Sequence, residues 1–436
     1  MILDLRKDRM RVLHRPFVRN VITLVAGTAL AQVVTVIFTP LVTRLYGPEA
    51  FGLLGTFTAL VAVLGPIASL SYPIAIVLPE KKSDAKGIVQ LSFYLSLFSS
   101  GITLALFLVG GKRLLSALGA EPIGEFVLLI PLNMLFAAWL QIAQQWMIRE
   151  KQFTTTARVN IVQTVLTNSV KVVIGWFKPL AGVLIFVSTF GNLFQAGLLS
   201  LGACRDVKGE SRPDPLPGRT PLWELVKRYS DFSLYRTPQV LINSISFNLP
   251  ILMLAALFGP ALAGFFVLAK NLLFMPTQLI GQSVGDVFYP YITEAAQQGE
   301  VLSKRIIKAT LSLALIGFLP FAFVVAFGPW LFGLVFGKSW AVAGEYARWL
   351  SIMIFLTFIN RPVVASIPTL GLQRGLMVYE LQSTGWKLAA LYMGFVFFKS
   401  DRVAIFLFSG VGAIFYIALI LWVVMSARKR DKCVEC

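Results

Sequence analysis

The stretch ATLSLALIGFLPFAFVVAFG, from Ala309 to Gly328, runs through 20 consecutive residues without one charged side chain. About 20 predominantly apolar residues are enough for a helix to cross a bilayer. The rest of the chain has the same character: of its 436 residues 57% are hydrophobic and 14% charged, and the mean hydropathy is +0.76. A water-soluble domain carries roughly 25% charged residues, so this composition indicates a membrane protein.

Twelve such stretches follow one another along the sequence, separated mostly by short polar turns. Because only helices and closed barrels satisfy the backbone inside lipid, and these stretches have helix length, we predict an all-α membrane protein with about 12 transmembrane helices. The expected spans are residues 20–43, 50–78, 85–110, 123–147, 155–177, 180–203, 232–258, 262–290, 304–328, 343–370, 376–398 and 402–426.

The longest polar connection, residues 204–231, is rich in proline, glycine and charge, and it divides the spans six and six. It is the natural linker between two lobes. We therefore expect an N-lobe at 20–203 and a C-lobe at 232–426, flanked by basic tails at 1–19 and 427–436.

A short repeat supports two equivalent lobes. LYGPEAFG (Leu45 to Gly52) follows the first span, and LFGPALAG (Leu257 to Gly264) follows the seventh. A weaker likeness joins the turns expected at 108–119 and 327–337. Since each lobe has an even number of spans, the lobes would be pseudo-symmetric about an axis along the membrane normal, around a central cavity, as in many transporters.

Lysine and arginine are distributed unevenly between the two sides of the membrane. With both termini on the inner side, 26 of the 34 positive charges outside the spans lie in inner segments. Positive residues near span ends are retained in the cytoplasm, so we predict cytoplasmic termini and a cytoplasmic 204–231 linker. The net charge of +18 then reflects topology and contact with anionic membrane lipids, and it does not point to nucleic acid.

No catalytic motif is found in the sequence. The single histidine, His14, lies in the basic N-terminal tail, and the few carboxylates inside the spans are not spaced as an acid–base pair. Cys433 and Cys436 have C-x-x-C spacing, but one such pair in a basic tail is a weak signal for a metal or redox site. We expect a protein that is not an enzyme and that holds no cofactor or metal.

Five cations lie inside the expected spans. A charge in the hydrocarbon region costs at least about 2.5–3.5 kcal/mol, so a deep one is a candidate for a functional cavity. The alternative is a long side chain that reaches back to the interface. Lys387 is the deepest, about 17 Å inside its span at 1.5 Å per residue. The five are Lys387, Arg361, Lys270, Lys171 and Arg236.

Polar residues recur at helical spacing on three of the spans. They are Thr28, Gln32, Thr35 and Thr39 on the first, Asn160, Thr164, Thr167, Asn168 and Lys171 on the fifth, and Arg236, Gln239, Asn243 and Ser246 on the seventh. Such residues can also serve as hydrogen-bonding contacts between helices. We expect Gln32, Thr35, Asn160, Thr164, Asn168 and Asn243 to line a water-filled cavity. Its positive charge suits an anionic, partly lipidic cargo with phosphate groups.

Four stretches carry a family resemblance. They are RLYGPEAFGLLGTF (Arg44 to Phe57), YPIAIVLPEKKSDA (Tyr72 to Ala85), QQWMIREKQF (Gln144 to Phe153) and AGFFVLAKNLLFMPTQLIGQSVGDVFYP (Ala263 to Pro290). With the twelve-span layout, they resemble the polysaccharide-transporter branch of the multidrug/oligosaccharidyl-lipid/polysaccharide exporter superfamily. Related sequences often carry an Arg-Tyr-Glu triplet before AIVLP, where this chain has Ser71, Tyr72 and Pro73.

The resemblance implies a flippase that works by alternating access in the bacterial inner membrane. Its cargo would be an undecaprenyl-pyrophosphate-linked oligosaccharide for O-antigen, capsule or exopolysaccharide synthesis. A polysaccharide polymerase and glycosyltransferases would be further partners.

Two other functions remain open from the sequence. A drug or metabolite exporter of the same superfamily would need an acidic cavity residue if its cargo were cationic, and none lies at a span midpoint. A polysaccharide polymerase or ligase would need a large outer loop with catalytic residues, and the outer loops expected here are short.

Overall fold

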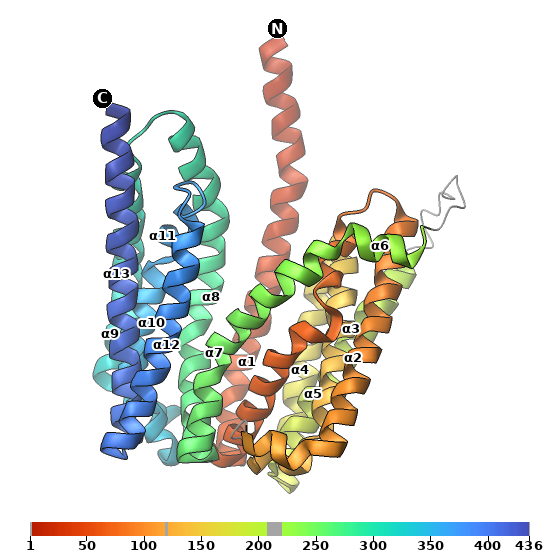
Figure 1. The fold of residues 1–436 in the computed structure, drawn as a ribbon, viewed down its shortest axis with the longest axis vertical. Helices are drawn as coiled ribbons and strands as arrows, with labels where there is room; N and C mark the ends of the chain where they lie inside the picture. The colour runs from red at the N-terminus through yellow and green to blue at the C-terminus, as the bar shows by residue number, and fades with distance from the viewer. Residues whose placement is uncertain (1, 118–120, 207–219, 436) are drawn as a thin grey trace. The chain divides into compact units, whose positions relative to one another are not determined.

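The computed structural model describes residues 2–117, 121–206 and 220–435 (Figure 1). Within these ranges the chain forms helices and contains no β-strand, which confirms the predicted all-α class. The elements are α1 (Ile2–Ser69), η1 (Tyr72–Val77), α2 (Lys82–Ala117), η2 (Glu121–Phe126), α3 (Leu129–Arg149), α4 (Phe153–Phe177), α5 (Ala181–Asp206), α6 (Leu222–Arg228), η3 (Phe232–Arg236), α7 (Thr237–Phe258), α8 (Pro260–Gln297), α9 (Leu302–Phe336), η4 (Lys338–Trp340), α10 (Ala341–Ile359), α11 (Arg361–Ser366), α12 (Gln373–Phe398) and α13 (Asp401–Glu435).

In the described part of the chain, eight helical segments are long and apolar enough to cross a membrane. They are residues 26–69, 82–111, 181–202, 232–258, 260–281, 302–336, 338–366 and 401–432. The first of these covers most of the first two predicted spans. α3, α4 and α12 are also helical where spans were predicted, but they carry more polar side chains. The count of twelve stays a prediction.

A bend in α1 separates its two predicted spans. Gly47 has φ 70° and ψ 173°, a backbone region that is essentially restricted to glycine, and Pro48 follows it. The second arm ends at Ser69, earlier than the predicted limit of residue 78, because Leu70 and Ser71 have left-handed φ values and a 3-10 turn follows.

Three other expected boundaries are corrected. The turn expected at 108–119 is helical as far as Ala117, and the turn expected at 327–337 is helical as far as Phe336. The likeness between those two stretches therefore does not mark a pair of turns. The predicted span 343–370 ends earlier, at Ser366, and Asn360 separates its two helices, α10 and α11.

The chain divides into two compact units, residues 1–256 (unit 1) and 257–436 (unit 2). The contacts group α6 and almost all of α7 with unit 1, so the change of unit comes near the end of α7. The expected limits of the N-lobe and C-lobe are not decided by this grouping and stay a prediction. Residues 207–219 of the expected linker lie outside the described residues.

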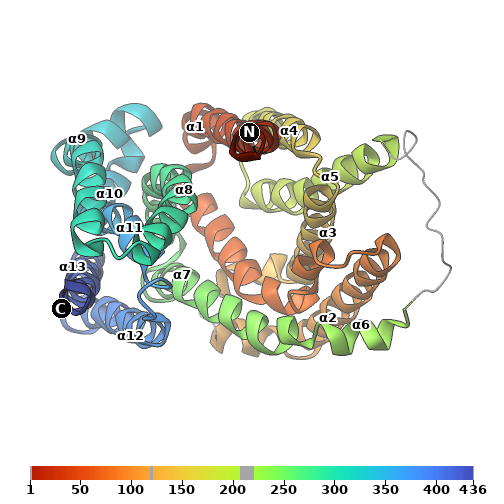
Figure 2. The same ribbon diagram turned by 90° about the horizontal axis from the view of Figure 1, so that it is seen from above.

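In unit 1, the first arm of α1 and α4 lie side by side (Figure 2), and their contacts show that they run in the same direction. Gly27 lies against Ala157, and nineteen residues later Tyr46 lies against Gly175. The Tyr46 hydroxyl also donates a hydrogen bond of 2.7 Å to the carbonyl of Lys171. Small residues thus bring the two helices into close contact at both ends.

The short helix α6 is held on the start of α2. Leu225 is fully buried and lies against Gly87, where any side chain would collide with it. The Thr220 hydroxyl donates to the buried carboxylate of Asp84 at 2.7 Å.

Ser71, which stands where related sequences often carry an arginine, and the neighbouring Tyr72 make neutral contacts. Thr237 at the start of α7 donates to the Ser71 hydroxyl at 3.1 Å. The Tyr72 hydroxyl donates to the carbonyl of Val226 in α6 at 3.3 Å. These two residues attach the beginning of α7 and the end of α6 to the segment that follows α1.

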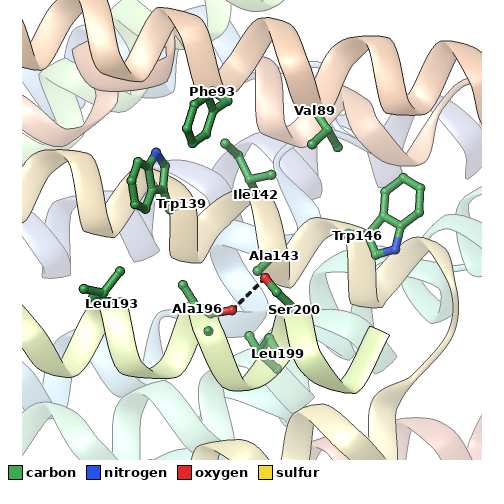
Figure 3. A pocket seen from close by; sticks show the side chains of 11 residues that line it. Val89, Phe93, Trp139, Ile142, Ala143, Trp146, Leu193, Ala196, Leu199 and Ser200 are labelled. Carbon is green, nitrogen blue, oxygen red and sulfur yellow. Dashed lines mark hydrogen bonds between the residues drawn. The ribbon is translucent and has the colours of Figure 1, made fainter. Parts of the chain in front are cut away.

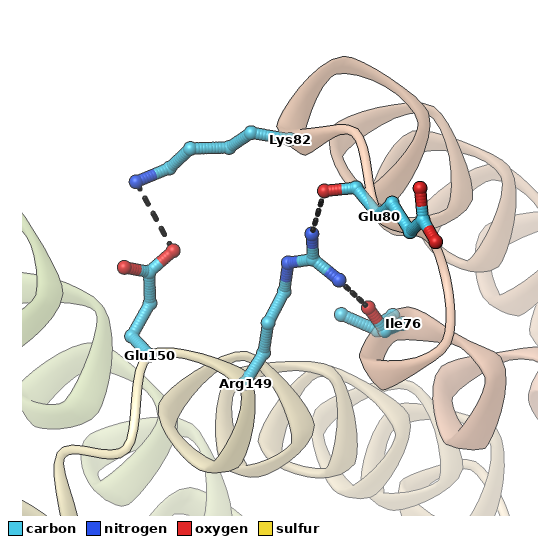
Figure 4. A network of polar contacts seen from close by, with 5 residues as sticks. All are labelled: Ile76, Glu80, Lys82, Arg149 and Glu150. Carbon is cyan, nitrogen blue, oxygen red and sulfur yellow. Dashed lines mark hydrogen bonds and ion pairs between the residues drawn. The ribbon is translucent and has the colours of Figure 1, made fainter. Parts of the chain in front are cut away.

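A charged network lies at the same end of unit 1 (Figure 4). Arg149, the last residue of α3, donates to the carbonyl of Ile76 at 3.0 Å and to that of Glu80 at 3.4 Å. Lys82, the first residue of α2, forms an ion pair of 3.1 Å with Glu150. The guanidinium of Arg149 thereby satisfies carbonyls left free where η1 ends.

In unit 2, α10 is the central helix and packs against α8, α9 and α13. Gly328 of α9 and Gly344 of α10 are in backbone contact. Proline at position 329 lacks the amide hydrogen that would pair with the carbonyl of Val325. Arg348 of α10 donates its Nε hydrogen to that carbonyl at 2.9 Å. A side chain of the neighbouring helix therefore replaces the backbone hydrogen bond that Pro329 cannot form.

The expected basic tail at 427–436 continues α13 as a helix to Glu435. Its Asp431 is buried, and its two carboxylate oxygens accept the backbone N–H groups of Leu302 and Ser303, each at 2.9 Å. Free N–H groups at a helix start favour such an acceptor. Asp431 therefore caps α9 from a distant part of the chain.

Candidate functional site

Unit 2 brings together three of the five predicted cavity cations. Lys270 lies on α8, Arg361 begins α11, and Lys387 lies in the middle of α12, about 17 Å from its C-terminal end. Lys270 is only 5% exposed. Lys387 is close enough to Lys270 for the two positive charges to repel each other.

Tyr416 of α13 connects Lys387 to Arg361. The Lys387 Nζ lies 5.9 Å from the centre of the Tyr416 ring, within the range of a cation–π contact. The Tyr416 hydroxyl is within electrostatic range of Arg361. The carbonyl of Tyr416 also accepts a hydrogen bond of 3.2 Å from Asn360, the residue before Arg361.

A glycine makes room for Arg361. A Cβ atom at Gly281 would lie 2.7 Å from the Arg361 Nε, whereas one at Gly412 would be in ordinary contact with the Lys387 Cδ, at 3.4 Å. Gly281 is eleven residues beyond Lys270 on α8, which at 1.5 Å per residue is about 17 Å. The cations therefore form a row along α8, which we call the cation row: Lys270, Lys387 and Arg361.

The cation row carries an excess of positive charge. Among the side chains that the structure describes, neither Lys387 nor Arg361 forms an ion pair, and the buried Nε of Arg361 has no hydrogen-bond partner. Glu380, two turns before Lys387 on α12, is an acid within electrostatic range of Lys387, but its side chain is exposed. Lysine and arginine side chains arranged in this way can bind phosphate by charge and hydrogen bonds.

The polar residues of α4 lie in unit 1, and the structure gives them local partners. The Asn160 side-chain oxygen accepts a hydrogen bond of 2.8 Å from Gln195 of α5. Thr164 and Asn168 each donate to a carbonyl one turn earlier on α4, at 2.7 and 2.8 Å. Asn160 therefore contributes to helix packing, which is the alternative that the sequence left open.

The remaining predicted residues of α1 and α4 are half-buried. Thr35 donates to the carbonyl of Ala31 at 3.0 Å. The Gln32 side-chain oxygen is buried without a hydrogen-bond partner among the described residues. Lys171 lies near the end of α4, where its carbonyl accepts the Tyr46 hydroxyl.

Arg236 and Asn243 are exposed, although they belong to a segment apolar enough to cross a membrane. An Arg236 N–H donates to the Gln239 side-chain oxygen at 3.0 Å. Exposed polar groups at membrane depth require water or a polar partner, because lipid offers neither. The end of η3 and the first half of α7 are therefore suited to a wet surface.

The structure thus joins Lys270, Arg361 and Lys387 in unit 2, whereas Lys171 and Arg236 and the six predicted polar residues belong to unit 1. One cavity shared by all of them stays a prediction. Sequence reasoning missed Tyr416 and the proximity of Glu380. A single tyrosine in the apolar run AIFYIALIL was the available signal for Tyr416.

The fold of the whole chain is found in membrane transporters of known structure. The lipid II flippase MurJ in an inward closed conformation is 10% identical, with a TM-score of 0.65 over 93% of this chain and 90% of that one. A multidrug resistance MATE family transporter of the MOP superfamily, outward-facing, is 15% identical, with a TM-score of 0.60 over 96% of each chain. A MOP superfamily transporter from Pyrococcus furiosus, whose binding pocket is described as having reverse polarity, is 15% identical, with a TM-score of 0.54 over 96% of each.

These likenesses define the class by its fold: a multi-pass membrane protein with the fold of MOP-type transporters and flippases. The sequence gives the family more directly, because residues 41–345 match the family model described as polysaccharide biosynthesis protein. The chain belongs to that family, and the predicted resemblance is confirmed. Among curated proteins, no sequence matches significantly.

Proposed function

We propose that this protein is a flippase for a lipid-linked oligosaccharide, and that the cation row binds the phosphate groups of the cargo. The observation that carries the proposal is that Lys387 and Arg361 form no ion pair with a described side chain inside unit 2, where the buried Lys270 is a third cation. A pyrophosphate that joins a prenyl chain to a sugar offers several anionic oxygens to such a row.

Membership in the polysaccharide biosynthesis family supports a sugar-containing cargo, and the name of the lipid II flippase MurJ describes a lipid-linked one for that protein. The proposed cargo is an undecaprenyl-pyrophosphate-linked repeat unit of a surface polysaccharide. It would cross the bacterial inner membrane by alternating access, with the chain termini in the cytoplasm. A polysaccharide polymerase and glycosyltransferases would consume and supply it.

A binding comparison tests the anionic part of this function. Purified protein is titrated with undecaprenyl pyrophosphate and with undecaprenol, which has the same prenyl chain without phosphate. We expect the wild type to bind the pyrophosphate at least ten-fold more tightly, since a hydrogen bond to a charged group contributes about 1.5–3 kcal/mol. Equal affinity for both lipids would contradict the proposal.

The same preparation distinguishes the flippase from the second candidate, a drug or metabolite exporter of the MOP superfamily. That reading is favoured by the MATE likeness, which concerns the fold only. Binding of an organic cation such as ethidium, without preference for the pyrophosphate lipid, would favour the exporter. The cation row argues against a cationic cargo, because like charges repel.

A further inference from the structure

A groove in unit 1 lies apart from the cation row and is lined almost entirely by hydrocarbon. It has a volume of about 400 Å³ and runs between α2, α3 and α5 (Figure 3). Val89 and Phe93 line it from α2, and Trp139 and Trp146 from α3. Its one hydroxyl, that of Ser200, donates to the carbonyl of Ala196 on the same helix, so the groove offers no free polar group from that residue.

The groove is elongated along α3. Trp139 and Trp146 are seven residues apart, about 10 Å at 1.5 Å per residue, and Figure 3 shows them at opposite ends. At the Trp139 end, the ring of Phe93 stacks on that of Trp139 with centroids 5.0 Å apart. Phe136 and Phe190 continue the aromatic contacts at 5.8 Å each. Aromatic rings therefore close this end.

Apolar side chains border the groove on α2 and α5. Leu97 follows Phe93 by one turn, Leu201 follows Gly197 by one turn, and both are exposed in unit 1. Exposed apolar side chains on membrane-spanning segments contact lipid tails. The groove therefore borders on a surface that fits the hydrocarbon of the bilayer.

The other end of the groove is charged. The Lys82 Nζ lies 5.9 Å from the Trp146 ring and 3.1 Å from the Glu150 carboxylate (Figure 4). One ion pair leaves ammonium donors for another acceptor, since lysine has three. Lys81, just before α2, and Lys86, in its second turn, are exposed at the same end, whereas the Arg149 guanidinium is already occupied by backbone carbonyls.

We infer that this groove binds an anionic phospholipid of the membrane, with an acyl chain between Trp139 and Trp146 and the phosphate beside Lys82. The charge complementarity of Lys82, Lys81 and Lys86 selects an anionic headgroup, and tryptophan at the boundary of apolar and charged surface is typical of a membrane interface. The charge distribution predicts that this end meets the cytoplasmic leaflet. The inference does not depend on the proposed cargo.

Gly197→Leu tests the tail site. Gly197 lines the groove, and a Cβ atom there meets nothing within 4 Å, so the side chain of a leucine has room to begin at this position and occupies part of the groove. Gly101→Leu is the matched control: Gly101 is also a helical glycine of unit 1 with open space at its Cβ, but it does not line the groove. Both changes remove a helix-destabilising glycine.

Delipidated protein is titrated with dioleoyl phosphatidylglycerol and dioleoyl phosphatidylcholine, and retained lipids are counted by native mass spectrometry. We expect the wild type and Gly101→Leu to retain phosphatidylglycerol preferentially, and Gly197→Leu to lose its most tightly held lipid. Lys82→Gln should lower the preference for phosphatidylglycerol roughly five-fold, the effect of one basic residue near an anionic surface. Lys81→Gln should lower it less.

Three outcomes would overturn the inference. Retention by Gly197→Leu equal to that of the control would show that the groove holds no lipid. An unchanged preference of Lys82→Gln for phosphatidylglycerol would show that Lys82 does not bind the lipid phosphate. Stronger retention of undecaprenyl phosphate than of phosphatidylglycerol, abolished by Gly197→Leu, would assign the groove to a prenyl lipid instead. None of these results bears on phosphate binding by the cation row, which is measured with Lys387 variants.

Discussion

Gly47 and Gly259 have nearly the same backbone conformation, although they lie 212 residues apart. Gly47 has φ 70° and ψ 173°, and Gly259 has φ 94° and ψ 168°. Each is followed by a proline that opens the next helical segment, Pro48 in α1 and Pro260 in α8. The matching sequences LYGP and LFGP thus encode the same kind of turn, one in each unit.

Replacing either turn glycine should destabilise the protein. This backbone region is nearly closed to other residues, and a side chain there costs about 1–3 kcal/mol. We expect Gly47→Ala and Gly259→Ala each to lower the thermal unfolding midpoint measured in one detergent. Gly101→Ala, in an ordinary helical position with open space, should not lower it. Unchanged midpoints in all three variants would show that these turns tolerate another conformation.

Much of the fold could be predicted because its signals are local. Apolar runs fix the helices, and the Lys178–Pro179 interruption correctly separates α4 from α5. The prediction of turns at 108–119 and 327–337 was wrong. Glycine and proline were read as turn residues, but they are tolerated inside a membrane helix when neighbours satisfy the backbone, as Arg348 does beside Pro329.

Less of the candidate site than of the fold could be predicted from the sequence. Lys270, Arg361 and Lys387 were each chosen as candidates because a charge deep in a membrane span is costly, and the depth of a residue can be read from its own span alone. Their grouping with Tyr416 depends on how α8, α11, α12 and α13 pack, and no spacing in the sequence contains that information. The proximity of Glu380 was available from the sequence, because Glu380 lies seven residues before Lys387 on the same helix. The cap provided by Asp431 is hidden for the same reason, since its partners lie more than 120 residues earlier.

Removal of the Asp431 carboxylate should loosen the start of α9. Loss of an N-cap costs about 0.5–2 kcal/mol, and here two N–H groups lose their acceptor. We expect Asp431→Ala to lower the unfolding midpoint and to speed amide hydrogen exchange at residues 302–305. Asp431→Asn, which keeps one acceptor oxygen, should have a smaller effect. Lys432→Ala, at the exposed neighbouring position, serves as the control. Exchange unaltered by Asp431→Ala would contradict the capping role.

The orientation of the chain can be tested with fusions. We expect a reporter that is active only outside the cytoplasm to be silent after Arg228 and active at Lys338, because 26 of the 34 extramembrane positive charges lie on the predicted inner side. The measurement is reporter activity normalised to the amount of fusion protein. The opposite pattern would reverse the topology and place the groove of unit 1 in the outer leaflet.

Gly281 offers a way to displace Arg361 without removing its charge. A methyl group at this position would approach the Arg361 Nε at 2.7 Å and its Cδ at 3.0 Å, so the flexible side chain must move. Alanine is the better helix former by about 1 kcal/mol, hence Gly281→Ala should not lower protein levels. We expect it to lower surface-polysaccharide export several-fold. Gly285→Ala, four residues along α8 with open space, is the matched control. Equal export in both variants would show that the place of Arg361 is unimportant.

Lys387 should matter most, because it is the member of the cation row that connects the other two. Its charge acts on Lys270, and its ammonium lies 5.9 Å from the Tyr416 ring, next to Arg361. Loss of one charged hydrogen bond to phosphate costs about 1.5–3 kcal/mol, or roughly ten- to hundred-fold in binding. We therefore expect Lys387→Ala to reduce export of surface polysaccharide by that order, with protein levels near those of the wild type.

Two further variants separate charge from packing at this position. Lys387→Arg keeps the positive charge and should restore part of the export, whereas Lys387→Met, of similar length but neutral, should not. Lys338→Ala removes an exposed lysine of the same unit and should leave export unchanged. Undecaprenyl pyrophosphate binding should fall in parallel with export in the alanine and methionine variants. Full export by Lys387→Met would mean that the side chain serves only to fill space between α12 and α13, and the phosphate-binding role of the cation row would have to be abandoned.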